Sequence, residues 1–147
     1  MIQYNQLKSG NLAFFENEKV MIQSIYFNDR RTDVMFYRQT LFQTIEDSWA
    51  TIEKFTSIPL NKNILMQLGF KDSFDKQKET IYYGYKFDKS FFITELEGCF
   101  KLFCHKLKWK VATVSNVHEL QNLVYLIKKI ELPIKNLIKL DIKEFTK

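Results

Sequence analysis

The sequence predicts an α+β protein in which short β-strands outnumber the helices, and three observations support this fold class. Phe, Tyr and Trp make up 16% of the 147 residues, and flat rings pack well on the pleated surface of a sheet. Hydrophobic residues make up 46%, with only 4 Gly and 2 Pro, so the chain can build a sizeable core. Most apolar residues occur in short runs or alternate along the chain, and few segments have helical periodicity.

Five segments in the first part of the chain have the length and composition of strands. They cover residues 12–15, 19–27, 33–38, 41–45 and 50–55. Turn residues separate them, at Gly10-Asn11, at Asn17-Glu18 and at the polar hairpin tip 28–31. Apolar residues in the second segment do not alternate strictly, which predicts a β-bulge near Gln23-Ser24. Five strands in about 55 residues are typical of a small SH3-like barrel.

A short helix with both ends specified is predicted to follow Pro59, which ends the last of these strands. Asn61 is suited to cap the first turn. Gly69 suits the left-handed position after the last turn, and Phe70 can then pack on Leu65. A helix of two turns is unstable alone, so we expect it to dock the barrel onto the rest of the fold through Ile64, Leu65 and Leu68.

An antiparallel meander with one solvent-exposed face is predicted for the middle of the chain. Residues 71–78 are polar and are expected to form a hairpin or loop. Strands are then expected at residues 80–88, 90–96, 99–104 and from 105 to about 111.

Two helices are predicted near the C-terminal end. The first has Ser115 as its N-cap candidate and Lys128-Lys129 at its end, where positive charge is favourable. Its apolar face consists of Val117, Leu120, Leu123, Val124 and Ile127. The segment 133–147 is expected to form a second helix with Pro133 at its first position. These elements predict a barrel subdomain in residues 1–57 and a second part in residues 58–147 that shares its core.

The net charge of +5 comes from the second half of the chain. Residues 1–60 carry six Lys or Arg and seven Asp or Glu, whereas residues 61–147 carry sixteen Lys and ten Asp or Glu. No apolar run has the roughly 18 residues that a membrane span needs, and the first residues lack a signal pattern, so a cytoplasmic location is expected. Cys99 and Cys104 have an odd spacing, which predicts opposite strand faces and two buried free thiols.

Catalytic and metal-binding patterns are missing from the sequence. His105 and His118 are the two histidines, and no cysteine pair at ligand spacing accompanies them. Glu95 and Glu97 share a strand face beside a turn, where solvated carboxylates are expected. There is no Gly-rich phosphate loop and no nucleophile elbow. The sequence therefore predicts a protein without enzymatic activity, cofactor or metal.

Basic residues are the best candidates for a binding site. Lys106, Lys108 and Lys110 would lie about 7 Å apart along one strand, and Lys101 and Lys86 would extend this line across the sheet. Such a line suits a phosphate backbone, with exposed Tyr82 or Phe103 available for base stacking. The alternative role is protection of a sheet edge against aggregation. Arg30 and Arg31 at the hairpin tip are a second candidate, and a solvated turn is the alternative for them.

Three motifs in this order resemble a family of small uncharacterised proteins carried by prophages and other bacterial mobile elements. The first is Gly10-Asn11, and the second is 58–70 with Ile58-Pro59-Leu60 and Leu68-Gly69-Phe70. The third is 117–125, followed a few residues later by Glu131-Leu132. The resemblance covers roughly residues 8–132. The family usually has an acidic pair where this chain has Lys62-Asn63, and residues 133–147 are an addition.

The resemblance implies a biological context but no chemistry. Small accessory proteins of mobile elements often bind and block a host machine, including RNA-guided nucleases. We therefore expect an anti-CRISPR-like inhibitor that docks on a host protein or ribonucleoprotein. The first alternative is a direct binder of RNA or single-stranded nucleic acid that uses the basic face, and a weaker one is a structural phage component.

Overall fold

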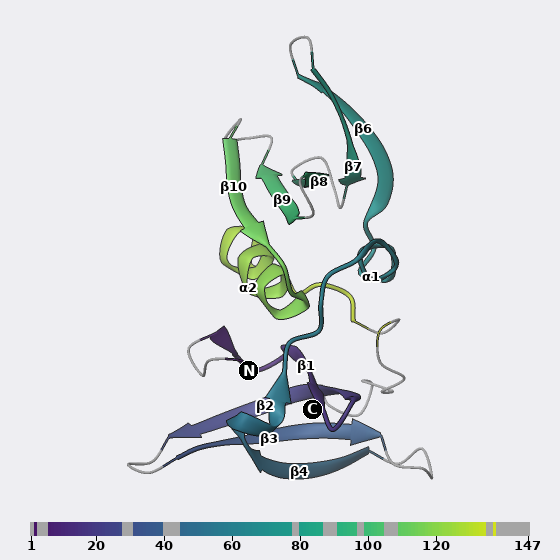
Figure 1. Cartoon of the computed structure of the whole chain (residues 1–147). Helices are drawn as coiled ribbons and strands as arrows, with labels where there is room; N and C mark the ends of the chain where they lie inside the picture. The colour runs from purple at the N-terminus through teal and green to yellow at the C-terminus, as the bar shows by residue number, and fades with distance from the viewer. Residues whose placement is uncertain are drawn as a thin grey trace. The chain divides into compact units, whose positions relative to one another are not determined.

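The computed structural model describes residues 2, 6–27, 31–39, 45–77, 80–86, 91–96, 99–104, 109–134 and 137. Within these residues it contains two five-stranded antiparallel sheets and two α-helices (Figure 1), which confirms the α+β class. The chain forms two compact units, one of Met1–Pro59 with Asn116–Lys147 and the other of Leu60–Ser115. The division predicted from the sequence, into residues 1–57 and residues 58–147 with a shared core, stays a prediction.

The first unit contains a sheet with the strand order β4-β3-β2-β1-β5. Its strands are β1 (Leu12–Phe15), β2 (Glu18–Phe27), β3 (Thr32–Gln39), β4 (Ile45–Thr51) and β5 (Phe55–Thr56). A 3-10 helix, η2 (Ile52–Lys54), joins β4 to β5. The prediction of one strand over 50–55 is therefore wrong, and that of a strand at 41–45 overlaps the described residues only at Ile45. The last strand pairs with the first, but no pairing of β4 with β5 closes a barrel within the described part.

Local signals of this sheet were predicted to within a residue. The register of β2 against β3 shifts between Ile22 and Ser24, which confirms the predicted bulge. The tight turn between β1 and β2 uses Glu16 and Asn17, with φ of 49° and 69°, one residue earlier than predicted. Two successive positive φ values are typical of a type I′ turn, whose twist matches that of the paired strands.

The core of the first unit lies on one face of this sheet. Three rings contact one another there, with centroids 4.6 Å apart for Phe15 and Phe36, 5.4 Å for Phe15 and Phe55, and 5.2 Å for Phe36 and Phe55. Edge-on and tilted contacts of this kind stabilise a core beyond the area that they bury. The other buried members are Ile2, Leu7, Ala13, Val20, Ile22, Val34 and Ile52.

The second unit contains a consecutive antiparallel meander with the order β10-β9-β8-β7-β6. Its strands are β6 (Lys71–Gln77), β7 (Thr80–Lys86), β8 (Phe91–Leu96), β9 (Cys99–Cys104) and β10 (Trp109–Val114). The meander is confirmed. Residues 71–77, within the segment predicted as a hairpin or loop, form the edge strand β6, which pairs with β7. A polar segment can form a strand at the edge of a sheet, where charged residues are common. Phe92, Ile93 and Thr94 are all buried, so the middle strand is covered on both faces and the sheet has no uniformly exposed face.

Helix α1 (Lys62–Gln67) has the predicted caps. The Asn61 side chain accepts a hydrogen bond from the Ile64 amide at 3.0 Å. Gly69 has a φ of 88°, and the Phe70 amide donates to the Leu65 carbonyl at 3.0 Å. This is the Schellman arrangement, and it leads the chain directly into β6. The docking of the barrel through this helix stays a prediction.

Truncation of Leu65 to alanine should test how much this helix contributes to stability. The Leu65 side chain is fully buried, and Leu→Ala at such sites lowers the free energy of unfolding by about 2–5 kcal/mol. Urea unfolding monitored by circular dichroism measures the loss. Met66→Ala is the control, because Met66 is an exposed neighbour on the same helix and should lose little; equal losses would contradict the expectation.

Helix α2 (Val117–Lys128) begins one residue later than predicted, with Asn116 as its N-cap in place of Ser115. Asn116 and Glu119 form a capping box, which satisfies the first amides of the helix. The helix ends as expected, at Lys128 with Lys129 in a left-handed conformation. Its N-terminal end is tied to the segment after β5, since the Val117 amide donates to the Ile58 carbonyl at 3.0 Å.

The segment after α2 differs from the prediction where it is described. Glu131–Ile134 is not helical, so the predicted helix does not begin at Pro133. The Leu137 amide donates to the Ile134 carbonyl at 2.8 Å. The remainder of the predicted helix, apart from Leu137, lies outside the described residues.

Candidate functional site

Two large aromatic side chains are exposed and touch each other on the first sheet. Tyr26 is 49% exposed and Trp49 is 54% exposed, and their ring centroids lie 4.9 Å apart. Tyr26 belongs to β2 and Trp49 to β4, so the contact crosses the intervening strand β3. Contiguous exposed aromatic surface of this kind is a candidate interaction site.

Strand register explains why the two rings meet. Tyr26 pairs with Asp33, Asp33 pairs with Thr51, and Met35 pairs with Trp49. Directly paired residues share a face, and so do residues two apart on one strand. These residues therefore lie on the face opposite the aromatic core. We call this the outer face; it comprises Ser24, Tyr26, Asp33, Met35, Tyr37, Asp47, Trp49 and Thr51.

A cavity of about 360 Å³ adjoins Trp49 at one end of the outer face. Its lining consists of Arg31, Asp33, Trp49, Ala50, Thr51 and Lys54. The Arg31 Nε lies 3.0 Å from an Asp33 carboxylate oxygen, and the arginine side chain is 62% exposed. This ion pair orients the guanidinium beside the cavity. Lys54, in η2, is exposed as well.

Both positively and negatively charged side chains lie near the Tyr26 and Trp49 rings. Burial, and then the negative charge of Asp47, raises the pKa of Tyr37, which keeps that phenol neutral. Hydrogen bonds from its own backbone amide, and then from Thr51, lower the pKa of the Glu53 carboxyl, which keeps it ionised. The outer face and its rim thus carry two cations, Arg31 and Lys54, and three carboxylates, on Asp33, Asp47 and Glu53.

The predicted basic residues are only partly described. Arg31 lies at the cavity just described, whereas Arg30 lies outside the described residues, as do Lys106 and Lys108. Lys101 is half-buried in β9. Tyr82 and Lys86 belong to β7 and Lys110 to β10, but their side chains lie outside the described part.

The expected line of Lys106, Lys108 and Lys110 along one strand stays a prediction, because residues 105–108 lie outside the described part. Strand β10 begins at Trp109, and its register shifts between Lys110 and Ala112. Within the described residues, strand pairing forms a row of positions across the sheet. The pairs Lys86 with Phe92, Phe92 with Phe103, and Phe103 with Lys110 place these positions, and that of Lys101, on one face.

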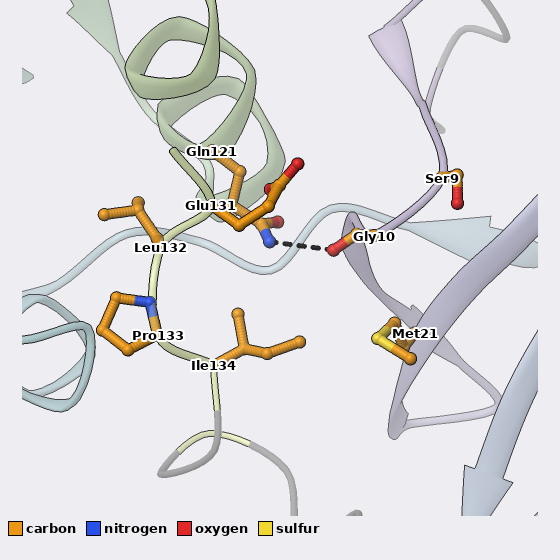
Figure 2. A pocket seen from close by; sticks show the side chains of 8 residues that line it. All are labelled: Ser9, Gly10, Met21, Gln121, Glu131, Leu132, Pro133 and Ile134. Carbon is orange, nitrogen blue, oxygen red and sulfur yellow. Dashed lines mark hydrogen bonds between the residues drawn. The ribbon is translucent and has the colours of Figure 1, made fainter. Parts of the chain in front are cut away.

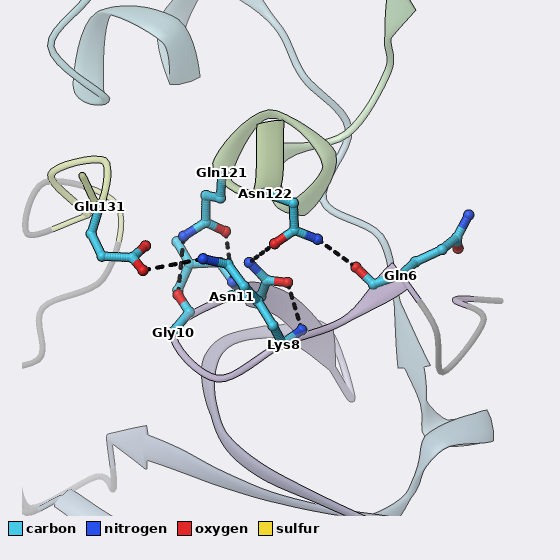
Figure 3. A network of polar contacts seen from close by, with 8 residues as sticks. Gln6, Lys8, Gly10, Asn11, Gln121, Asn122 and Glu131 are labelled. Atoms are coloured by element: carbon cyan, nitrogen blue, oxygen red, sulfur yellow. Dashed lines mark hydrogen bonds and ion pairs between the residues drawn. The ribbon is translucent and has the colours of Figure 1, made fainter. Parts of the chain in front are cut away.

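A network of side-chain amides joins α2 to the start of β1 (Figure 3). Gln121 accepts a hydrogen bond from the Leu12 amide at 2.9 Å and donates to the Gly10 carbonyl at 3.0 Å. Asn122 accepts from the Asn11 side chain at 2.9 Å and donates to the Gln6 carbonyl at 2.7 Å. Two motifs that carried the family resemblance therefore meet in space, and these four contacts have a structural role.

A second cavity, of about 370 Å³, lies beside this network (Figure 2). Its lining is mostly apolar and consists of Ser9, Gly10, Met21, Gln121, Glu131, Leu132, Pro133 and Ile134. The Gln121 amide is already bonded to backbone groups, and Glu131 forms an ion pair with Lys8 at 3.1 Å. The side chains of Gln121 and Glu131 are thus engaged with the protein itself.

His118 is a buried histidine in the first turn of α2, and only 1% of it is exposed. Neither ring nitrogen has a hydrogen-bond partner. Burial lowers the pKa of His118, and the nearby Glu119 carboxylate opposes this only in part. The neutral imidazole is therefore the form that the fold accommodates.

The free energy of unfolding should fall as the pH drops below about 6.5, the usual pKa of histidine in an unfolded chain. Below that pH the imidazole of His118 is protonated in the unfolded state but stays neutral in the folded state, so the free energy of unfolding rises with pH in this window. Urea unfolding between pH 5 and 8 should show a flatter profile for His118→Leu than for the wild type. His105→Leu is the matched control, and an unchanged slope in His118→Leu would contradict the assignment.

Cys99 is exposed and has a free thiol, so the prediction of two buried thiols is wrong for this residue. It lies at the first position of β9, where a strand end is open to solvent. The Cys104 side chain lies outside the described part.

The described residues contain no group of three or more His, Cys, Asp or Glu that could hold a metal ion. None of their helices combines the length and the hydrophobicity that crossing a membrane requires. Comparison of the chain with protein-family models, with curated proteins and with solved structures gave no match. The resemblance to mobile-element proteins therefore stays a prediction.

Proposed function

We propose that this is a non-enzymatic binding protein and that it docks on a protein partner through the outer face. The exposed contact between Tyr26 and Trp49 is the observation that carries the proposal. Tyr, Trp and Arg are the residues most enriched at the energetic centres of protein interfaces. All three types occur together here, because Arg31 lies at the cavity beside Trp49.

Charge favours a protein partner over nucleic acid at this site. A phosphate backbone needs an excess of positive charge. Here the two cations are offset by three carboxylates, and residues 1–60 as a whole carry a net charge of −1. Protein interfaces instead combine an aromatic centre with a polar rim of mixed charge.

The class of partner in this proposal comes from the family resemblance. It is a nucleic-acid-targeting defence complex of a bacterial host, most concretely an RNA-guided nuclease, in the cytoplasm. An inhibitor of this kind needs no chemistry, since covering a functional surface of the complex is enough. Small barrels are common interaction modules, and the pairing of β5 with β1 supports an SH3-like barrel as the scaffold.

Affinity capture from a host lysate that contains an RNA-guided nuclease tests this function. The wild type should retain a stoichiometric partner and reduce target cleavage, and Tyr26→Ala/Trp49→Ala should lose both effects. The control is Leu126→Ala/Ile130→Ala, which removes two exposed apolar side chains, one on α2 and one just after its end. Capture that is equal for all three proteins would contradict docking through the outer face.

A second candidate function is direct binding of single-stranded nucleic acid by the second sheet. The observation that favours it is the register row with lysine positions at 86, 101 and 110 on one face. Phe92 and Thr94 share this face and are buried, so only part of it is open. Because nucleic acid could contact only the open part of this face, we propose nucleic-acid binding as the second candidate.

Fluorescence anisotropy with short RNA and DNA tests the second function. If it is correct, Lys86→Glu/Lys101→Glu/Lys110→Glu should abolish binding. Single substitutions should each lower the slope of log affinity against log salt by about 0.7–0.9. Lys19→Glu/Lys54→Glu/Lys62→Glu has the same charge change at other positions and serves as the control. Binding that survives the first triple substitution would exclude this function.

A further inference from the structure

We propose that the cavity beside Trp49 binds the carboxylate of an acidic side chain on a short peptide segment of the partner. The neighbouring residue of that segment, aromatic or large and aliphatic, would pack on the Tyr26 and Trp49 rings. This inference rests on the function proposed above, because it names the chemistry that the outer face recognises.

Charge complementarity within the cavity leads to an acidic ligand. The lining contains two cations, Arg31 and Lys54, and a single carboxylate, Asp33. The Arg31 Nε is held by Asp33 at 3.0 Å, so the guanidinium is oriented rather than freely rotating. A planar guanidinium and a second cation together suit a carboxylate, which can accept several charge-assisted hydrogen bonds.

Surrounding charges favour a singly charged carboxylate over a phosphate. Asp33 lies in the cavity lining. Asp47, two residues from Trp49 on β4, and Glu53, next to Lys54 in η2, carry further negative charge. A phosphate group carries nearly two negative charges at neutral pH, so these carboxylates would repel it more strongly than they repel a carboxylate. The volume of about 360 Å³ lies at the lower end of the range of ligand pockets, which suits one or two side chains rather than a nucleotide.

Trp49 connects the cavity with the aromatic pair. Its ring lines the cavity and also touches Tyr26 on the outer face. A ligand residue in the cavity therefore has its chain neighbour within reach of both rings. This geometry predicts a two-residue signature of one acidic and one aromatic or large aliphatic residue, adjacent or nearly adjacent in sequence.

Selection from a phage-displayed library of random linear peptides, with the full chain immobilised, tests the signature. Wild-type selection should enrich Asp or Glu next to Phe, Tyr, Trp, Leu or Met. The best peptides, made synthetically, should bind Trp49→Ala at least tenfold more weakly by isothermal titration. Arg31→Glu/Lys54→Glu should also bind them at least tenfold more weakly and should enrich Lys or Arg in its own selection. Lys62→Glu, at the first position of α1, should leave the affinity unchanged.

The outcomes separate this inference from the proposed function. Peptides that need Trp49 but show no acidic preference, or that bind Arg31→Glu/Lys54→Glu unchanged, would overturn the carboxylate site and leave docking through the outer face standing. Peptides that bind Trp49→Ala as well as the wild type would contradict both. A selection without enrichment would overturn the linear acidic segment, and the capture experiment alone would then decide the proposed function. Melting curves of each variant show whether it is folded.

Discussion

Replacement of Gln121 by leucine is expected to lower the free energy of unfolding of the first unit by about 2–6 kcal/mol. The Gln121 side chain is 1% exposed, and it satisfies the Leu12 amide and the Gly10 carbonyl. Leucine fills similar space but leaves both backbone groups without a partner, and each loss costs about 1–3 kcal/mol when the group is buried. Urea unfolding followed by circular dichroism measures the change.

Two further substitutions show whether hydrogen bonding is the cause. Asn122→Ala should cost less, because the Asn122 bond to Gln6 lies in an exposed place. Gln121→Glu keeps the acceptor for Leu12 but donates to Gly10 only when protonated, so the folded state raises the pKa of the new carboxyl. Its stability should then be closest to wild type below about pH 4.3, the unfolded value, and fall as the pH rises. If the loss of unfolding free energy in Gln121→Glu instead became smaller as the pH rises, the hydrogen bond from residue 121 to the Gly10 carbonyl would not be its cause.

Elements that depend on neighbouring residues were predictable from the sequence. The caps of α1, the bulge near Gln23 and the turn at Gly10 follow from side-chain chemistry within a few positions, and the structure confirms them. Most strands of the second sheet were also expected from the apolar pattern, whereas the polar strand β6 was not. The predicted start of α2 at Ser115 was one residue early, because the neighbouring Asn116 is the N-cap. The strand predicted at 50–55 is interrupted by the 3-10 helix η2.

Contacts between distant segments were not predictable in the same way. Gln121 lies between Leu120 and Val124 on the buried side of α2. A polar residue on this otherwise apolar face is the one sequence feature that could have indicated the hydrogen-bond network with β1. The pair of Tyr26 and Trp49 depends on the register of three strands. The sequence reading had left Trp49 between two strands, so its face could not be assigned, whereas the charge pattern directed attention to lysines.

Replacement of Trp49 by alanine is expected to weaken binding of the protein partner by about 2–4 kcal/mol, or roughly thirty- to a thousandfold in Kd. The Trp49 ring is half exposed, touches Tyr26 and lines the cavity beside Arg31, so it can contact the partner at the centre of the outer face. Its loss should affect folding much less, since an aromatic contact of this kind contributes about 0.5–1.5 kcal/mol. Surface plasmon resonance with the captured partner measures Kd, and urea unfolding measures stability.

A double-mutant cycle shows whether the two rings act as one surface. If Tyr26 orients Trp49 for the partner, then Tyr26→Ala should also weaken binding. The double variant should then lose less than the sum of the two single losses, with a coupling of about 0.5–3 kcal/mol. Leu126→Ala is the matched control, because Leu126 is 66% exposed and belongs to α2, which contributes no residue to the outer face. Additive effects would show that each ring binds separately, and an unchanged Kd for Trp49→Ala would exclude the outer face as the docking surface.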